Sequence, residues 1–352
     1  MHAKAEPDVS PDDVAARREA FYARADTQHL APLWTRLKAL VPKLPAHQLV
    51  PHVWHYDDLR PHVMESARQI SAAEAERRVM ILENPALRGS SQITNTLYAG
   101  LQLIMPGEVA PAHRHTQSAL RFIVEGSGAY TAVDGEKTIM QPGDFVITPS
   151  WTWHHHGHDG DGPMVWLDGL DIPMCTFFGS TFREDHDQAE APVARPVGDA
   201  LARYGSGLLP VGYVARNLNS PVFNYPWART REALHALTKA GVPDAHTGHL
   251  MRYVNPVDGG WAMPTMATMV RLLPAGFATL PYRSSDSMVF TTVEGRGELR
   301  VADQVFAMGP RDIAVVPGWM PYTLHARDDW ALFSYSDRVA QEKLGLWREA
   351  RG

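Results

Sequence analysis

Gly107-Glu-Val-Ala-Pro-Ala-His113-Arg-His115 opens the stretch of sequence that decides the fold, and Pro149-Ser-Trp-Thr-Trp-His154-His155-His156 closes it. Short apolar runs at 101–105, 120–124 and 145–148 lie beside or within this stretch, and turn signals such as Asp134-Gly135 separate them. Short runs bounded by two-residue turns are typical of antiparallel hairpins. The stretch therefore predicts a meander of short strands.

Three histidines of this stretch predict a metal site. His113 and His115 lie two residues apart, so on a strand their side chains leave the same face, and His154 returns from a later strand. Two imidazoles on one face and a third from across a small barrel can bind a metal ion and leave coordination positions open. From the residues alone, zinc and iron suit this site about equally, because imidazole binds both. His155 should point away from the site.

The spacing of these residues resembles the cupin signature. The matching positions are Gly107, His113, His115, Gly126, Gly143, Pro149 and His154. Ala119 stands where the signature has a Glu ligand, and Trp151 stands where it has Gly. This departure, with the string from Pro111 to Gly126 and the Trp-Thr-Trp-His that ends at His154, resembles the gentisate 1,2-dioxygenase group of bicupins, which includes salicylate and 1-hydroxy-2-naphthoate dioxygenases. The resemblance extends from about Val79 to about Tyr335.

The resemblance implies a function and a cofactor. It implies Fe(II) at the three histidines, and a non-haem iron dioxygenase of the extradiol type that uses O2. The substrate would be a 2-hydroxybenzoate, cleaved between its carboxyl- and hydroxyl-bearing carbons. Gentisate, which would give maleylpyruvate, is the first expectation. The alternatives are salicylate, 5-nitrosalicylate or another 5-substituted salicylate, and 1-hydroxy-2-naphthoate. The resemblance also implies a homotetramer.

The implied fold is all-β. It is a bicupin, with two double-stranded β-helix (jelly-roll) barrels and an N-terminal helical extension. The expected segments are a helical leader and packing segment at 1–84, a metal-binding barrel at 85–180, a linker with a helix at 181–250, a degenerate barrel at 251–340 and a tail at 341–352.

Within the leader, Ser10-Pro11-Asp12 predicts a helix start, and the apolar stripe from Leu33 to Leu40 predicts a second helix that Pro42 ends. Pro45, Pro51 and Pro61 predict irregular structure. Further along the chain, 79–82 should form a strand and 228–240 a helix that Gly241 closes.

The second half of the sequence repeats the first. Gly276 follows Gly107 by 169 residues, and Val289-Phe-Thr-Thr-Val-Glu-Gly echoes Arg121-Phe-Ile-Val-Glu-Gly. A period this long indicates duplicated domains. In the second copy the ligand positions are Tyr282, Ser284 and Tyr322, which cannot bind a divalent metal with imidazoles. We therefore expect a structural role for the second barrel.

Several residues are candidates for binding the substrate. Arg121 follows the His-x-His on the next strand, and an arginine buried in an apolar barrel needs an anion such as a carboxylate. Tyr98, Gly100 and Gln102 share one strand face, where Gly100 would leave space for a flat ring between polar contacts. These positions and Arg77 match substrate-pocket positions of the resembled group.

His156 and Asp168 are expected in the same pocket, where they would orient the substrate or exchange protons. His156 shares a strand face with His154, and Asp168 would fix the tautomer of His156. On its strand, Asp168 is expected to alternate with Trp166, so that one of the two points into the barrel. The role of His158 stays open.

Bulk properties restrict the partners. A net charge of −6 gives no electrostatic reason to expect nucleic acid or an anionic membrane. The single cysteine, Cys175, excludes an internal disulfide. No run of about 20 apolar residues occurs, and no signal peptide is evident, so a cytoplasmic protein is expected. Two other functions stay open: a non-catalytic bicupin that binds a small acid, and a zinc isomerase or hydrolase.

Overall fold

The computed structural model describes residues 10–45 and 48–352, which divide into two compact units, Met1–His47 and Gln48–Gly352. The first unit contains α1 (Pro11–Asp26) and α2 (Leu33–Leu40), as the sequence predicts. Ser10 caps α1, because its hydroxyl oxygen accepts a hydrogen bond of 3.2 Å from the backbone N–H of Asp13.

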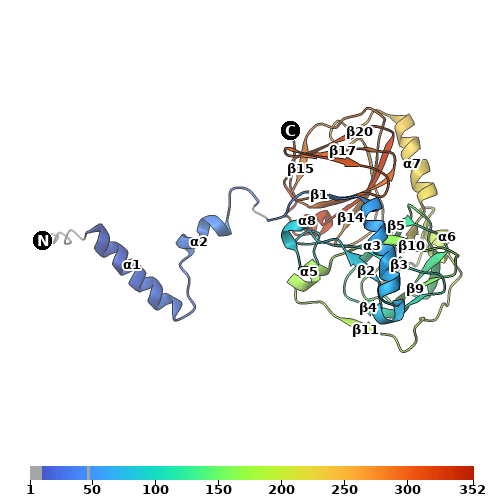
Figure 1. The fold of residues 1–352 in the computed structure, drawn as a ribbon, viewed down its shortest axis with the longest axis horizontal. Helices are drawn as coiled ribbons and strands as arrows, with labels where there is room; N and C mark the ends of the chain where they lie inside the picture. The colour runs from blue at the N-terminus through green and yellow to red at the C-terminus, as the bar shows by residue number, and fades with distance from the viewer. Residues whose placement is uncertain (1–9, 46–47) are drawn as a thin grey trace. The chain divides into compact units, whose positions relative to one another are not determined.

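The second unit consists of two barrels, each made of two antiparallel sheets (Figure 1). In the N-terminal barrel the sheets run β12-β8-β5-β10-β3-β2 and β11-β4-β9-β6-β7. The bounds of these strands are β2 (Val79–Ile81), β3 (Tyr98–Ile104), β4 (Val109–His115), β5 (Ala119–Glu125), β6 (Ala129–Val133), β7 (Glu136–Ile139), β8 (Phe145–Thr148), β9 (His154–His158), β10 (Met164–Leu170), β11 (Arg183–Asp185) and β12 (Asn224–Tyr225). The predicted meander and the strand at Val79 are confirmed.

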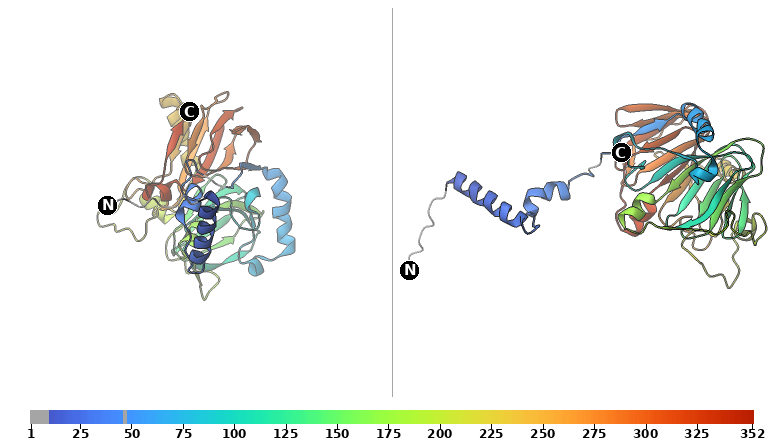
Figure 2. Two further views of the ribbon diagram at one scale, coloured as in Figure 1. Left: turned by 90° about the vertical axis from the view of Figure 1, so that its left-hand side faces the viewer. Right: turned by 60° about the horizontal axis from the view of Figure 1, so that its bottom comes forward.

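In the C-terminal barrel the sheets run β1-β19-β16-β21-β14-β13 and β18-β17-β20-β15-β22. The bounds are β1 (His52–Trp54), β13 (His249–Arg252), β14 (Ala267–Leu273), β15 (Tyr282–Ser284), β16 (Met288–Glu294), β17 (Gly297–Val301), β18 (Gln304–Met308), β19 (Ile313–Val316), β20 (Tyr322–Ala326), β21 (Trp330–Ser336) and β22 (Glu349–Arg351). Figure 2 shows the two barrels from two further sides, with the C-terminal strands in orange and red.

Short helices lie around the barrels. They are α3 (Tyr56–Gln69), α4 (Ala72–Ala75), the 3-10 turn η1 (Pro85–Leu87), α5 (Ile172–Phe177), α6 (Asp199–Tyr204), α7 (Trp227–Ala240) and α8 (Arg338–Lys343). Helix α7 is the predicted linker helix, and Gly241 follows it in an extended conformation. In the described part of the chain, no helix is both long and apolar enough to cross a bilayer.

The structure bears out the internal repeat. His113 on β4 lies opposite His154 on β9, and Tyr282 on β15 lies opposite Tyr322 on β20 in the same way. The fold is therefore a bicupin in which one barrel retains the three histidines.

One of the hydrophobic cores of this unit spans both barrels. It contains Leu101, Phe122 and Phe145 from the first barrel and Val270, Phe333 and Tyr335 from the second. The rings of Phe122 and Phe333 stack with centroids 4.4 Å apart and an interplanar angle of 16°. The Tyr335 hydroxyl donates a hydrogen bond of 3.0 Å to the carbonyl oxygen of Tyr98, on a strand of the candidate site.

The expectation of irregular structure around Pro51 and Pro61 is wrong. The segment forms β1, which pairs with β19 at the edge of the C-terminal sheet, and then α3 with Pro61 inside it. A proline removes one helical hydrogen bond, and burial of Tyr56 and Val63 on α3 offsets that loss. Edge pairing with a strand some 260 residues later leaves no local signal in the sequence.

Candidate metal centre

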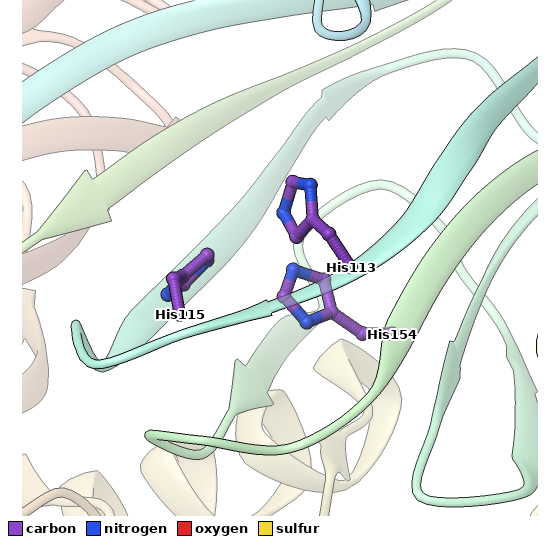
Figure 3. A group of neighbouring side chains, drawn as sticks. All are labelled: His113, His115 and His154. Atoms are coloured by element: carbon purple, nitrogen blue, oxygen red, sulfur yellow. The ribbon is translucent and has the colours of Figure 1, made fainter. Parts of the chain in front are cut away.

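Three histidines converge inside the N-terminal barrel, as the sequence predicts (Figure 3). His113 and His115 come from β4 and His154 from β9, and one nitrogen from each lies within 4.8 Å of the others. The register of β4 against β9 shifts between Ala110 and His113. Such a bulge changes the direction in which the next side chains point, and Pro111 falls within it.

The surroundings hold these imidazoles neutral and oriented. Burial is the main cause that lowers the pKa of His113 to about 2 and that of His115 to about 4, and it lowers the pKa of His154 well below its ordinary value. The Nδ1 atoms of His115 and His154 lie 2.9 Å from the carbonyl oxygens of Gln117 and Thr152. An Nδ1–H that donates to a carbonyl leaves Nε2 as the metal-binding lone pair. The donor set therefore fits a divalent transition metal.

Trp151 adopts the left-handed conformation of the glycine that it replaces. Its φ is 59°, and the equivalent Trp319 in the second barrel has a φ of 64°. Large side chains rarely adopt this conformation. Near the site, the guanidinium of Arg114 lies 4.6 Å from the Trp151 ring and 4.7 Å from the Trp153 ring. Cation–π contacts of this kind offset part of the backbone strain.

Arg121 is buried beside the histidine cluster, as expected. Its Nη1 donates to the hydroxyl of Thr148, and its Nη2 lies 3.0 Å from Nε2 of His156. Since an arginine only donates, Nε2 of His156 accepts, and Nδ1–H donates to the Thr131 hydroxyl oxygen 2.9 Å away. Arg121 and Thr131 therefore fix the His156 tautomer. The expectation that Asp168 fixes it is wrong, because no hydrogen bond joins those two side chains in the described part of the chain.

Asp168 instead contacts Trp166 and Arg121. Its Oδ1 accepts a hydrogen bond of 3.0 Å from Trp166 Nε1 and lies 3.7 Å from Arg121 Nε. Residues two apart on a strand share a face, so Trp166 and Asp168 both point inward, and the expected alternation between them is wrong. Burial raises the pKa of Asp168 to about 6, while Arg121 opposes that shift.

Tyr98, Gly100 and Gln102 lie on β3, and all three are buried. Gly100 is opposite Asp168 and Gln102 is opposite Trp166, so this face belongs to the site. A Cβ on Gly100 would meet Val79 Cγ1 at 2.5 Å and the Tyr98 hydroxyl oxygen at 2.9 Å. The volume beside Gly100 is therefore taken by these two side chains, rather than left open for a ring.

Arg77 also faces the site. Its Nη2 donates a hydrogen bond of 2.9 Å to the Pro111 carbonyl and lies 3.4 Å from Nε2 of His113. Burial, together with the charge of Arg121, lowers the pKa of Arg77 to about 9. Two guanidinium groups thus lie close to the three histidines.

His155 and His158 lie outside the cluster. Nδ1 of His155 accepts from the N–H of Ala191, so its ring points away from the three ligands, as expected. His158 holds a turn, where Nε2 contacts the carbonyl oxygen of Gly162 and Nδ1 accepts from the N–H of Gly160.

Three residues of the site escaped sequence reasoning: Thr131, Thr148 and Val79. Thr131 lies opposite His156 across β6 and β9, and Val79 lies opposite Gln102 across β2 and β3. Only the strand register brings them to the site. A correct pairing of strands would have identified them, whereas no local motif does.

The comparisons with known proteins agree with this geometry. The cupin domain family matches residues 100–170. The chain is 53% identical over 338 residues to gentisate 1,2 dioxygenase 1 of Aquipseudomonas alcaligenes, which covers 96% of this chain and 97% of that protein. It is 40% identical over 343 residues to a gentisate 1,2-dioxygenase of a Streptomyces species, which covers 95% of each.

A solved structure is also similar over nearly the whole chain. It is a variant of the salicylate 1,2-dioxygenase from Pseudoaminobacter salicylatoxidans in complex with gentisate, with a TM-score of 0.90 and 32% identity, covering 100% of this chain and 98% of that one. Fold and site together define a bicupin whose N-terminal barrel carries a three-histidine metal centre. The chain belongs to the gentisate and salicylate 1,2-dioxygenase family of ring-cleaving enzymes.

Proposed function

We propose that this protein is an Fe(II)-dependent dioxygenase that opens the ring of a 2-hydroxybenzoate between its carboxyl- and hydroxyl-bearing carbons, with gentisate as substrate and maleylpyruvate as product. The observation that carries the proposal is the meeting of three neutral imidazoles with two guanidinium groups, Arg77 and Arg121, inside one barrel. The names of the similar enzymes support the choice of gentisate.

Iron is proposed over zinc because the reaction needs redox chemistry. Zinc has no accessible redox state, whereas Fe(II) bound by His113, His115 and His154 would supply electron transfer to O2 and Lewis-acid polarisation of the substrate oxygens. Three protein ligands would leave room at the metal for the substrate and for O2. Since the cluster contains no carboxylate, a substrate anion would balance the charge of the metal.

Arg121 and Arg77 are proposed to bind the carboxylate of the substrate. Arg121 is buried, and its Nε–H lacks a hydrogen-bond partner among the described residues, at 3.7 Å from Asp168. The mutual repulsion of the two cations contributes to the low pKa of Arg77, so an anion bound between them would stabilise both. Thr148 and His156 hold the Arg121 guanidinium in place.

Tyr98, Gly100 and Gln102 are proposed to form the wall against which the ring lies. The absence of a side chain on Gly100 lets Val79 and the Tyr98 hydroxyl approach β3 closely, so these two groups determine the shape of that wall. Exchange of either group should change which ring substituents fit.

His156 and Asp168 are proposed to have different roles. The pKa of His156 lies well below its ordinary value because the ring is buried beside Arg121, so it stays neutral and positions the arginine. Asp168 has a pKa of about 6, which lets it gain or lose a proton near neutral pH. We propose Asp168 as the proton-exchanging group of the pocket.

The experiment is oxygen uptake by the Fe(II)-reconstituted protein with gentisate, salicylate, 5-nitrosalicylate and 1-hydroxy-2-naphthoate, with catechol as a control that lacks the carboxylate. Uptake with gentisate, none with catechol, and a product with the mass of gentisate plus O2 is the expected result. Uptake only with a substrate that lacks the 5-hydroxyl group would keep the reaction and change the substrate. Uptake with none, or activity with zinc alone, would contradict the proposal.

Salicylate is the second candidate substrate, because a salicylate 1,2-dioxygenase of the same family is similar over the whole chain and has been solved with gentisate bound. Overlapping substrate ranges are therefore expected. The ratio of the kcat/KM values for gentisate and salicylate decides which of the two is the preferred substrate. We further propose a homotetramer, which light scattering on the eluting protein would test.

A further inference from the structure

The C-terminal barrel contains a buried arginine, Arg271, at the strand position that Gln102 occupies in the N-terminal barrel. Arg271 on β14 follows Gln102 on β3 by 169 residues, which is the offset between Gly276 and Gly107. The strand pairing supports this equivalence. Gln102 lies opposite Trp166, the third residue of β10, and Arg271 lies opposite Leu332, the third residue of β21. Only 1% of Arg271 is exposed, and its strand neighbours Met269 and Leu273 belong to the core of this barrel.

This guanidinium has a neutral partner, the Tyr322 hydroxyl, but no opposite charge beside it among the described residues. Among the described residues, Nε and Nη1 of Arg271 have no hydrogen-bond partner, and no carboxylate lies within ion-pair distance of this side chain. The side chain packs over the Phe290 ring, 5.1 Å from its centroid. Burial of a charged group without an opposite charge is costly, and the cost falls when an anion binds.

The two barrels differ at the position that would supply such a charge. In the N-terminal barrel, Asp168 lies opposite Gly100 and 3.7 Å from Arg121. In the C-terminal barrel, Ser334 lies opposite Met269, the residue 169 positions after Gly100. Its hydroxyl is fully buried and also lacks a partner among the described residues. The second barrel thus replaces a carboxylate with a neutral donor.

A buried carboxylate, Asp286, also lies in this barrel. Oδ1 of Asp286 accepts a hydrogen bond of 2.8 Å from Trp347 Nε1, and its Oδ2 has no partner among the described residues. Asp286 acts electrostatically on Tyr322, whereas Arg271 acts on it through both its charge and a hydrogen bond. No ion pair joins Asp286 and Arg271 in the described part of the chain. Asp286 would repel a dianion and would leave a monovalent anion at Arg271 as the better match.

We propose that the C-terminal barrel binds a small monovalent anion, of the size of a halide or formate, at Arg271 and Ser334. Large side chains such as Met269, which stands where the first barrel has Gly100, fill this interior and restrict the ligand to a few atoms. The degenerate barrel would thereby be an anion-binding module rather than packing alone. This inference does not depend on which substrate the first barrel takes.

The direct test is anomalous scattering from crystals of the iron-loaded protein soaked in sodium bromide or, in a second arm, high-resolution data from crystals grown in sodium formate. We expect a bromide peak within hydrogen-bonding distance of the Arg271 guanidinium, and formate density there if carboxylates also bind. Bromide only on the surface, or ordinary water bridging Arg271 to Ser334 in both arms, would overturn the proposal.

Thermal unfolding gives an independent test. When chloride replaces gluconate at constant ionic strength, the Tm of the native protein should rise saturably by about 2 °C or more. Arg271→Met should fold, since an apolar residue of similar length replaces an unpaired buried charge, and should lose the chloride response. Arg300→Met, which removes an exposed arginine of the same barrel, is the matched control and should keep it. A chloride response that persists in Arg271→Met would contradict the assignment.

Discussion

Each of the three histidines has a counterpart in the second barrel that occupies the same strand position without an imidazole. Tyr282 and Tyr322 lie opposite each other as His113 and His154 do. The backbone that presents a metal site is therefore present twice, and residue identity alone decides which copy binds metal.

The consequence is that His154→Ala should reduce iron affinity by at least about 100-fold and abolish turnover, because two imidazoles remain. Iron content by plasma emission spectrometry, after equilibration with limiting Fe(II), measures the loss. Tyr322→Phe changes the equivalent position of the other barrel and should leave iron content and turnover unchanged. Full iron occupancy in the His154 variant would refute the ligand assignment.

Arg121→Met should keep iron and lose substrate affinity. Loss of hydrogen bonds to a charged carboxylate predicts a rise in KM of about 10- to 100-fold. Steady-state oxygen uptake together with iron analysis separates the two effects. An unchanged KM would show that the carboxylate lies elsewhere.

The carboxyl group of Asp168 makes a pH-dependent contribution to stability. Its ordinary pKa is 3.8, and burial raises it to about 6 in the folded protein. Between these values the folded state holds the proton more tightly than the unfolded state, so the free energy of unfolding falls as pH rises through this window, by up to about 3 kcal/mol. The contribution is present below about pH 3.8 and lost above about pH 6.

Asp168→Asn cannot titrate, so its stability relative to the native protein should improve as pH rises from 4 to 6 and stay constant above 7. Urea denaturation of both proteins at a series of pH values gives the difference. A pH-independent difference would mean that the pKa of this carboxyl is not raised.

The sequence predicts the residues of the site better than the contacts among them. The three histidines follow from strand periodicity, since His113 and His115 are two apart. The partner of His156 does not follow from periodicity, because only the pairing of β6 with β9 brings Thr131 next to His156. A side chain's neighbours across a sheet depend on register, and register depends on contacts distant in sequence.

At the scale of the elements, β9 is the strand on which the site depends. It lies between β4 and β6 and carries both His154 and His156. Gly157 on the same strand lies beneath the ring of Tyr130, and a Cβ there would meet the Tyr130 hydroxyl oxygen at 2.3 Å and Cζ at 2.4 Å. Lys137 Nζ lies 3.6 Å from the centroid of the Tyr130 ring, and the Tyr130 hydroxyl donates a hydrogen bond to Oε2 of Glu190. The Tyr130 side chain therefore has little freedom to move.

Gly157→Ala should therefore destabilise the protein by about 1–3 kcal/mol and shift β9 enough to weaken iron binding. Gly162→Ala is the matched control, because a Cβ at that position meets no atom within 4 Å. Tm and iron content measured on both variants test the expectation, and equal Tm values would contradict it.

Elements also show where local sequence signals fail. The Ser-Pro-Asp start of α1 and the stripe of α2 were sufficient to predict both helices, because capping and periodicity are local. Pro61 led to the wrong prediction for α3, since packing of its apolar face outweighs one lost hydrogen bond.

At the scale of the whole molecule, we expect the two barrels to fold as one unit because they share a core. Residues Gln48–Gly352 form a single compact unit, and the stacked rings of Phe122 and Phe333 join the halves. The duplication in the sequence predicted two barrels, but it did not predict that their large sheets would pack on each other, since both sheets read simply as buried strands.

Phe333→Ala should destabilise both barrels together, by about 3–5 kcal/mol. Calorimetry should show one transition for residues 48–352 that moves to lower temperature as a whole. Two separated transitions, with only the C-terminal barrel affected, would contradict a shared core. Leu346→Ala, which changes a side chain that is 60% exposed, serves as the control and should leave the transition in place.

The strand His52–Trp54 forms the edge of the C-terminal sheet, and with three residues it keeps that edge short. It pairs with β19 at the margin of the C-terminal sheet, so its removal would expose a row of unpaired backbone N–H and C=O groups. A chain shortened to begin at residue 48 keeps this cover, whereas one that begins at residue 56 lacks it and offers a template for another chain. A chain that begins at residue 56 should therefore aggregate, whereas one that begins at residue 48 should not.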